Sequence, residues 1–262
     1  MIKSTALPKV EIHRRGTGPA VILLHCLGVD HRLWDIAAPN LSDFFETLSY
    51  DFAGHGASPT PQTGYSIEDL AEQLAEIVRA QSLGKLHVCG ISLGGLVAQR
   101  FAAHYPEFVE KLVLVDTTPC YTGEMQSVWR ERAATARQRG VGVMIDHLLQ
   151  VWFTPAFIAA NGPAVSYVRK CLEAASGEGY ALACEALAAA DLRPILGSIA
   201  APTLVVCGRE DLPSFIDAAH LLSREIRKAE LLWLEPARHA SILEQPANFI
   251  AVLLPFLNRR RE

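Results

Sequence analysis

Residues 86–104 read LHVCGISLGGLVAQRFAAH, and this stretch decides the fold. Leu86 to Cys89 is a short apolar run, typical of a strand that is covered on both faces. Leu93 to His104 has the pattern of a helix. Between them, Gly90-Ile91-Ser92-Leu93-Gly94 fits G-x-S-x-G, a sharp strand-to-helix turn that presents a serine nucleophile. The alternative is a glycine-rich turn in which the serine is incidental.

The same alternation of strands and helices extends outward on both sides of this turn. Helical spacing of apolar residues predicts a helix from the capping Ser66 to about Ala80, and another over Ala247 to Leu257. Strands alternating with helices favour an α/β fold with a mostly parallel sheet and helices on both faces. The further strands are expected at Val10–Arg14, Val21–His25, Thr47–Phe52, Lys111–Val115, Thr203–Cys207 and Glu230–Leu234.

The alternation stops between about Cys120 and Ala200, where only helical patterns occur. We therefore expect a core domain made of residues 1–119 and 201–262, with an all-helical lid, residues 120–200, inserted in it. Ligands of such sheets bind at the carboxyl ends of the strands, which is where the lid would lie. The lid helices are expected at Gln126–Arg139, Val143–Phe153, Ala164–Ala175 and Tyr180–Ala190.

A serine nucleophile needs a base, and His239 is the candidate because it follows the last strand. His55, on the glycine-rich loop 54–56, is the rival. His87 lies inside a predicted strand, and His104, His147 and His220 lie in helical stretches, so we interpret these four as structural. The base needs a carboxylate that fixes its tautomer. Asp211 follows the strand that ends at Cys207, and the order Ser92, Asp211, His239 is the one that α/β-hydrolases use.

Two other carboxylates could take the place of Asp211. Glu210 is its neighbour but would point elsewhere on a tight turn, and Asp116 also ends a strand. The oxyanion of such a reaction needs two N–H donors, for which we predict the backbone of Leu93 and of Leu27, with Cys26 as the alternative to Leu27.

The composition narrows the function further. The chain has 262 residues and a net charge of −4, which argues against nucleic acid as a partner. Its one basic cluster, Arg259 to Arg261, is expected to be a solvated end. The apolar run Phe249 to Leu257 is too short to span a membrane. No secretory signal is evident, and the six cysteines show no metal-ligand spacing, so reduced thiols and a cytoplasmic location are expected.

These motifs together resemble the α/β-hydrolase superfamily over essentially the whole chain. A narrower resemblance, to the 3-oxoadipate enol-lactonases, rests on several segments, most of them in or near the lid. They are Gly28–Asp35, Trp129–Arg132, Trp152–Phe157, Glu178–Ala181 with Asp191–Arg193, and Leu243–Pro246. The chain departs from that family's pattern at Cys26, Ala53 and Arg238.

The resemblance implies that Ser92, Asp211 and His239 open a small carboxylated lactone through an acyl-enzyme, without metal or organic cofactor. The substrate would be 3-oxoadipate enol-lactone, which the β-ketoadipate branch of aromatic catabolism hydrolyses to 3-oxoadipate. A free carboxylate on that substrate calls for a cation, for which Arg132 and Arg130 are the candidates. Lid arginines are also commonly solvated partners of glutamate.

Trp129 and Trp152 could wall the pocket, although aromatic residues on helices are more often core. The same three catalytic residues would also serve a carboxylesterase, an amidase, a C–C bond hydrolase or a cofactor-free perhydrolase. From another class, the fold could act as a ligand receptor without turnover. The sequence leaves monomer and homodimer open.

Overall fold

The computed structural model describes residues 7–259, whose strands form one seven-stranded sheet in the order β1-β3-β2-β4-β5-β6-β7. The edge strand β1 is antiparallel to β3, and every other neighbouring pair is parallel. The expected α/β architecture is therefore confirmed. The strands are β1 (His13–Arg15), β2 (Ala20–Leu24), β3 (Glu46–Ser49), β4 (Leu86–Ile91), β5 (Val109–Val115), β6 (Thr203–Gly208) and β7 (Ala229–Leu234).

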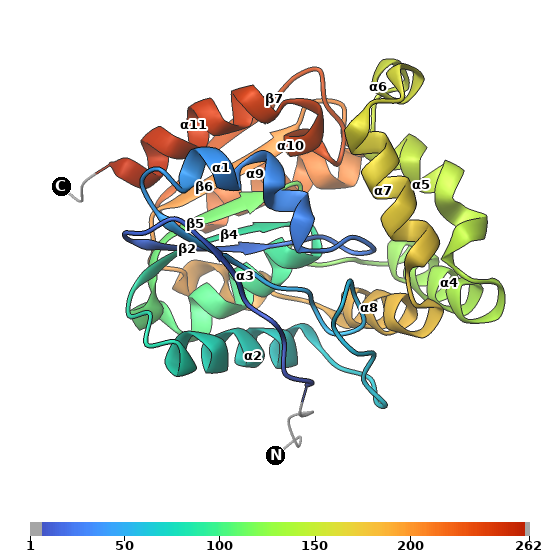
Figure 1. Ribbon diagram of the computed structural model, residues 1–262, viewed down its shortest axis with the longest axis horizontal. Coiled ribbons are helices and arrows are strands. Elements are labelled where there is room, and N and C mark those ends of the chain that lie inside the picture. Colours follow the sequence, from blue (N-terminus) through green and yellow to red (C-terminus); the bar gives the residue numbers. More distant parts are fainter. Residues whose placement is uncertain (1–6, 260–262) are drawn as a thin grey trace.

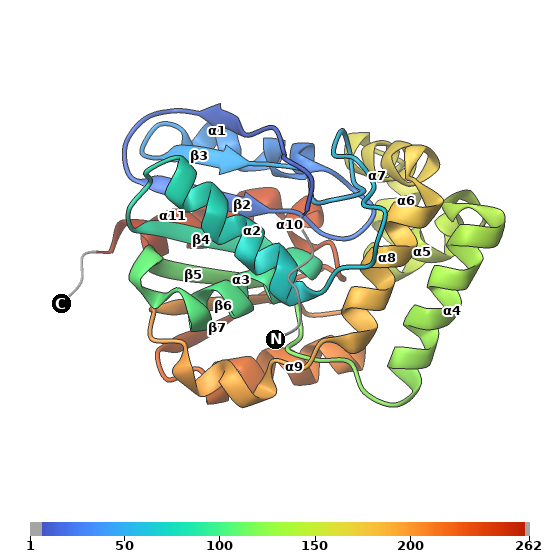
Figure 2. The same cartoon turned by 90° about the horizontal axis from the view of Figure 1, so that it is seen from below.

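Helices cover both faces of this sheet. Figures 1 and 2 show α1 (Ala38–Leu41) and α11 (Pro246–Asn258) on one face, and α2 (Ile67–Ala80) and α3 (Leu93–His104) on the other. The helix α9 (Pro213–Glu225) packs against β6 and β7. Every residue of β2, β4 and β6 is buried as a result, which explains their continuous apolar runs.

The helix α2 begins where the sequence predicts. The Ser66 hydroxyl accepts a hydrogen bond from the Asp69 backbone N–H, and the Asp69 carboxylate accepts one from the Ser66 backbone N–H. This reciprocal pair satisfies two N–H groups that a helix start otherwise leaves without partners.

Five α-helices lie between β5 and β6 in the chain, and both views show them gathered at one end of the sheet (Figures 1 and 2). A short β-bridge between Cys120 and Asp191 joins the two ends of this segment. The segment is seated tightly on the core, because a Cβ atom on Gly179 would lie 2.4 Å from the Gly54 carbonyl oxygen. Its helices are α4 (Glu124–Arg139), α5 (Ile145–Trp152), α6 (Pro155–Ala160), α7 (Pro163–Ala174) and α8 (Gly177–Ala189).

Some boundaries differ from the sequence expectation. The first strand covers His13–Arg15 only, and α8 starts at Gly177 rather than Tyr180 because the Ser176 hydroxyl caps it. A separate 3-10 turn, Val141–Met144, precedes α5. Of the basic cluster at the end, Arg260 and Arg261 lie outside the described residues. Within residues 7–259, no helix combines the length and the apolar character needed to cross a membrane.

Candidate active site

Ser92 occupies a strained turn between β4 and α3. Its backbone adopts φ +53° and ψ −112°, a conformation that costs a non-glycine residue energy and persists only when its surroundings hold it. Neighbouring backbone explains the two glycines of the motif. A Cβ atom on Gly90 would lie 2.2 Å from the Gly94 carbonyl oxygen, and one on Gly94 would lie 2.3 Å from that of Leu24. The turn therefore forms only with glycine at both positions.

The structure brings Ser92, His239 and Asp211 together in one hydrogen-bonded row. His239 Nε2 lies 3.0 Å from Ser92 Oγ, and His239 Nδ1 lies 2.9 Å from Asp211 Oδ2. The other oxygen of Asp211 accepts the Leu212 backbone N–H at 2.7 Å. Because a carboxylate only accepts, the proton of the neutral ring sits on Nδ1, and Nε2 is free to accept the serine proton.

Electrostatics keep this histidine basic although it is buried. Burial alone would lower the pKa of His239, but the charge of Asp211 and its hydrogen bond outweigh that effect, and the net pKa is raised. The ring also packs against Phe215, with 4.2 Å between the ring centroids. His239 therefore accepts a proton more readily than an ordinary imidazole does.

Neither rival carboxylate is hydrogen-bonded to His239. Asp116 is fully buried and accepts from the Gly208 N–H and from the backbone and hydroxyl of Ser241. Burial and the neighbouring Asp211 raise the pKa of Asp116 to about 7. Glu210 is exposed. Asp116 therefore ties the end of β5 to the end of β6 and to the start of α10 (Ser241–Glu244).

The rival histidine is also directed elsewhere. His55 is buried, with Nδ1 3.2 Å from the Ala53 carbonyl oxygen, and burial lowers its pKa to about 3. In the described residues it makes no hydrogen bond with Ser92. Its loop is braced by Asp51, whose carboxylate accepts the backbone N–H groups of His31 and Ala57, each at 2.8 Å.

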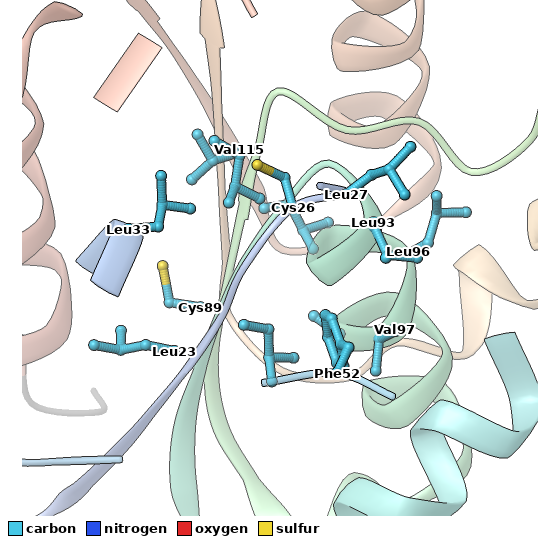
Figure 3. Close-up of a cluster of buried hydrophobic side chains, with 14 of the residues drawn as sticks. Leu23, Cys26, Leu27, Leu33, Phe52, Cys89, Leu93, Leu96, Val97 and Val115 are labelled. Carbon is cyan, nitrogen blue, oxygen red and sulfur yellow. The ribbon is translucent and has the colours of Figure 1, made fainter. Parts of the chain in front are cut away.

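The loop after β2 is fixed by a buried histidine. The Phe52 N–H donates to His25 Nε2 at 2.9 Å, so the ring proton is on Nδ1, which donates to the Cys26 carbonyl at 2.8 Å. That carbonyl shares a planar peptide with the Leu27 N–H, which therefore points the opposite way. Figure 3 shows Cys26, Leu27 and Leu93 in the apolar cluster at this end of the sheet. Within residues 7–259, neither the Leu27 nor the Leu93 N–H donates to a protein acceptor.

The Cys26 side chain is inert in this setting. It is buried, and burial raises the pKa of its thiol far above the ordinary value. The thiolate that a cysteine nucleophile needs is therefore disfavoured.

The two candidate arginines of α4 differ in their exposure. Arg132 of α4 is half-buried, and its guanidinium carbon lies 4.6 Å from the centre of the Trp129 ring. It forms no ion pair with a carboxylate of the described chain. Its positive charge opposes the rise in the pKa of His239 that Asp211 causes. Arg130 is exposed on the same helix, so Arg132 is the better placed of the two to act on the site.

Trp129 and Trp152 are both buried. Trp129 packs edge-on against Tyr121, with 5.1 Å between the ring centroids. The Trp152 carbonyl accepts the Ala240 N–H at 2.9 Å, directly beside His239. Trp152 is therefore connected to the site through its backbone.

Tyr121 and Tyr180 escaped the sequence analysis as site residues. Both are buried. The Tyr121 hydroxyl, like Trp129 Nε1, has no hydrogen-bond partner in the described chain, and the Tyr180 hydroxyl lies beside the Arg132 guanidinium. Burial raises the pKa of each hydroxyl, and the nearby Arg132 guanidinium opposes that rise. Buried donors without acceptors are rare in folded proteins. The available signal was Tyr180 itself, which lies in the lid segment Glu178–Ala181.

Among residues 7–259, two groups of side chains have the composition of a metal site, but their atoms already form hydrogen bonds or ion pairs. In the first, Asp30 pairs with Arg32 and Asp51 accepts from His31. In the second, Asp116 and Asp211 lie near Cys207, and both carboxylates accept the hydrogen bonds described above. The carboxylates of both groups thus hold neighbouring loops together through hydrogen bonds, and their oxygens are already engaged in this way rather than free to bind a cation.

Comparison with known proteins identifies the fold family of this chain. The profile of a family described as alpha/beta hydrolase fold matches residues 19–150. The chain is 36% identical to 3-oxoadipate enol-lactonase 2 of Acinetobacter baylyi, covering 88% of this chain and 85% of that one. It is 29% identical to 3-oxoadipate enol-lactonase 1 of the same organism, over 95% and 92%. The crystal structure of the enol-lactonase from Burkholderia xenovorans LB400 superposes with a TM-score of 0.91 at 31% identity, covering 97% of this chain and 99% of that one.

Proposed function

The chain belongs to the α/β-hydrolase fold family, and from that premise we propose that it hydrolyses 3-oxoadipate enol-lactone to 3-oxoadipate. Membership supports a hydrolase, and the names of the two Acinetobacter relatives support the lactone. The observation that carries the proposal is the hydrogen-bonded row of Ser92, His239 and Asp211. The reaction would belong to the β-ketoadipate branch of aromatic catabolism, in the cytoplasmic location expected from the sequence.

Acylation starts at Ser92. His239 Nε2 takes the hydroxyl proton while Oγ attacks the ring carbonyl, and Asp211 stabilises the imidazolium that forms. The ring oxygen then leaves as an enolate, which His239 protonates, and the resulting enol tautomerises to the ketone. Since an enol is a better leaving group than an alcohol, ring opening needs less help than ordinary ester cleavage.

Deacylation reuses the same groups. His239 removes a proton from water, the hydroxide attacks the acyl carbon, and the proton returns to Ser92 Oγ. The N–H groups of Leu27 and Leu93 are the proposed donors to the oxyanion in both steps, since neither has a protein acceptor in the described chain and Leu93 opens α3. Donors held in advance where charge develops are typically among the largest contributions to such catalysis.

The substrate carboxylate would bind at Arg132. The two nitrogens of a guanidinium match the two oxygens of a carboxylate, and this guanidinium has no competing carboxylate in the described chain. The buried donors of Tyr121, Tyr180 and Trp129 lie around it. Together they would form an anion-binding wall of the pocket, and Trp152 would contribute apolar surface. Arg130, although a candidate in the sequence, has no part in this proposal.

Residues 120–200 would act as the lid of this site, with residues 1–119 and 201–262 as the core. Contacts between the two support the division. The Tyr167 hydroxyl of α7 lies 3.1 Å from the Asp30 carbonyl oxygen, and α8 sits on the loop that contains Gly54. Closure over the sheet end would exclude water during acylation. No cofactor enters the proposed reaction. The protein would act as a monomer or a homodimer, as the sequence analysis states.

The test is turnover of 3-oxoadipate enol-lactone, followed by its ultraviolet absorbance, with wild type and with Ser92→Ala. We expect rapid loss of absorbance with wild type and only background loss with the variant. Absence of turnover with wild type, together with hydrolysis of simple esters such as p-nitrophenyl acetate, would replace the lactonase by a carboxylesterase. Turnover that survives in Ser92→Ala would reject the mechanism. Single labelling without steady turnover would indicate a receptor.

A further inference from the structure

The chain on both sides of His239 is hydrogen-bonded to the lid rather than to the core alone. The Ala240 N–H donates to the Trp152 carbonyl at 2.9 Å. On the other side, Arg238 Nη1 donates to the Gln150 carbonyl at 2.6 Å. Both acceptors belong to the last turn of α5, whose carbonyls have no partner within the helix. The residues on either side of His239 are therefore both hydrogen-bonded to the same lid helix, α5.

Glu244 is a buried residue that is hydrogen-bonded both to the histidine loop and to the lid. Its Oε1 accepts the Arg238 backbone N–H at 2.7 Å. Its Oε2 accepts the Thr154 backbone N–H at 3.0 Å and the Thr154 hydroxyl at 2.6 Å. Thr154 in turn caps α6. One carboxylate therefore holds the residue before His239 and the α5–α6 junction of the lid (α10 lies beside these lid helices in Figure 1).

We propose that Glu244 is a positioning residue for His239, which acts through the Arg238 backbone and fixes the histidine loop to the lid at Thr154. The inference rests on the proposed catalytic role of His239. It goes beyond that role because Glu244 touches neither Ser92 nor Asp211 in the described hydrogen bonds, and lies five residues further along the chain.

The geometry of the row explains why such a residue is needed. The His239 ring keeps two hydrogen bonds at once, at 2.9 and 3.0 Å on opposite edges. A rotation or shift of its backbone lengthens one of them. A displacement of about 1 Å at a reacting group can cost about a hundredfold in rate. Loops carry catalytic residues productively only when surrounding contacts fix them.

The substitution Glu244→Gln tests this directly. An amide oxygen can satisfy both donors of Thr154, but its NH₂ group then faces the Arg238 N–H, which loses its acceptor. We expect kcat to fall about 10- to 100-fold with KM changed less than about threefold. The matched control is Glu178→Gln, which removes an exposed lid carboxylate bonded to Arg137, and it should leave both constants unchanged.

A second readout separates positioning from a merely structural role. The charged groups acting on His239 are Asp211, Asp116 and Arg132, and Asp211 raises the pKa of the ring. A loosened loop weakens that hydrogen bond, so the acidic limb of kcat/KM should move down toward the ordinary imidazole value of about 6.5. A structural role alone would lower the melting temperature and leave this limb in place.

The labelling rate of Ser92 by a fluorophosphonate removes the dependence on the true substrate. Wild type should be labelled rapidly and Glu244→Gln about 10- to 100-fold more slowly. Equal labelling of both, with equal kcat and equal pH limb, would overturn this inference while leaving the proposed function intact. Failure to label wild type would overturn both.

Arg238→Ala and Thr154→Val keep the inference testable if Glu244→Gln does not fold. The first removes the anchor to Gln150, and the second removes the hydroxyl donor to Glu244 together with the side-chain cap of α6. Each should slow labelling about three- to tenfold. Wild-type rates in both would contradict the inference.

Discussion

Replacing Arg132 by methionine should change the selectivity of the enzyme rather than its chemistry. Methionine keeps an unbranched apolar side chain over the Trp129 ring, where the guanidinium now lies at 4.6 Å, and removes only the charged fork. A hydrogen bond to a charged group contributes about 1.5–3 kcal/mol when buried. Because Arg132 is half-buried, we take about 2–3 kcal/mol for the two bonds together, which corresponds to about a 30- to 150-fold lower kcat/KM.

The assay compares two substrates with each enzyme variant. One is the carboxylated lactone, and the other is its methyl ester at the free carboxylate, which is neutral. Arg132→Met should lose the stated factor on the first, mainly through KM, and less than about threefold on the second. Arg130→Met, an exposed arginine of the same helix, is the matched control and should behave as wild type on both. An equal loss on both substrates, or none, would refute the assignment of Arg132 to the carboxylate.

Three further predictions follow from the site and the core. The pH profile of kcat/KM should have an acidic limb with its midpoint above about 6.5, because Asp211 raises the pKa of His239. Asp211→Asn should lower kcat about 10³- to 10⁴-fold. An unchanged profile in that variant would exclude the Asp211–His239 pair from the catalytic base. Gly94→Ala should lower kcat at least about a hundredfold or prevent folding, since the new Cβ would lie 2.3 Å from the Leu24 carbonyl oxygen. Gly142→Ala is the control, because Gly142 has open space around it. Wild-type activity in Gly94→Ala would refute the argument. Burial, with Lys111, lowers the pKa of His87 to about 4, so the unfolded chain binds the extra proton between about pH 6.5 and 4. The free energy of unfolding should therefore fall as the pH falls through that window, by up to about 1.4 kcal/mol per pH unit. Urea titrations at several pH values should show a weaker pH dependence of this free energy in His87→Gln. An equal pH dependence in both proteins would contradict the argument.

Much of the site could be located from the sequence because of one property of parallel sheets. Their strands all end at the same edge, so residues that follow strands, such as Ser92, Asp211 and His239, converge there. The choice between Asp211 and Asp116 could not be derived in the same way, since both follow strands. It depends on the Ser241 hydroxyl and the Gly208 N–H, which occupy the Asp116 carboxylate.

The positions of side chains in the helical segment 120–200 could not be predicted from the sequence, for a different reason. Arg130 and Arg132 lie on one helix, and only the rotation of α4 relative to the core decides which of them is half-buried and which is exposed. The sequence analysis did not single out Tyr121 and Tyr180, because the burial of their hydroxyls beside Arg132 is a tertiary property. Propensity and periodicity describe each helix alone, so the convergence of these donors emerges only once the helices pack.

The central claim is that Ser92 carries the acyl group, and mass spectrometry of the enzyme quenched in acid during turnover tests it most directly. Ring opening of a lactone expels no fragment, so the adduct should have the mass of the whole substrate and map to the peptide that contains Ser92. It should be absent from Ser92→Ala. Turnover without such an adduct, or an adduct on another residue such as Cys26, would contradict the mechanism.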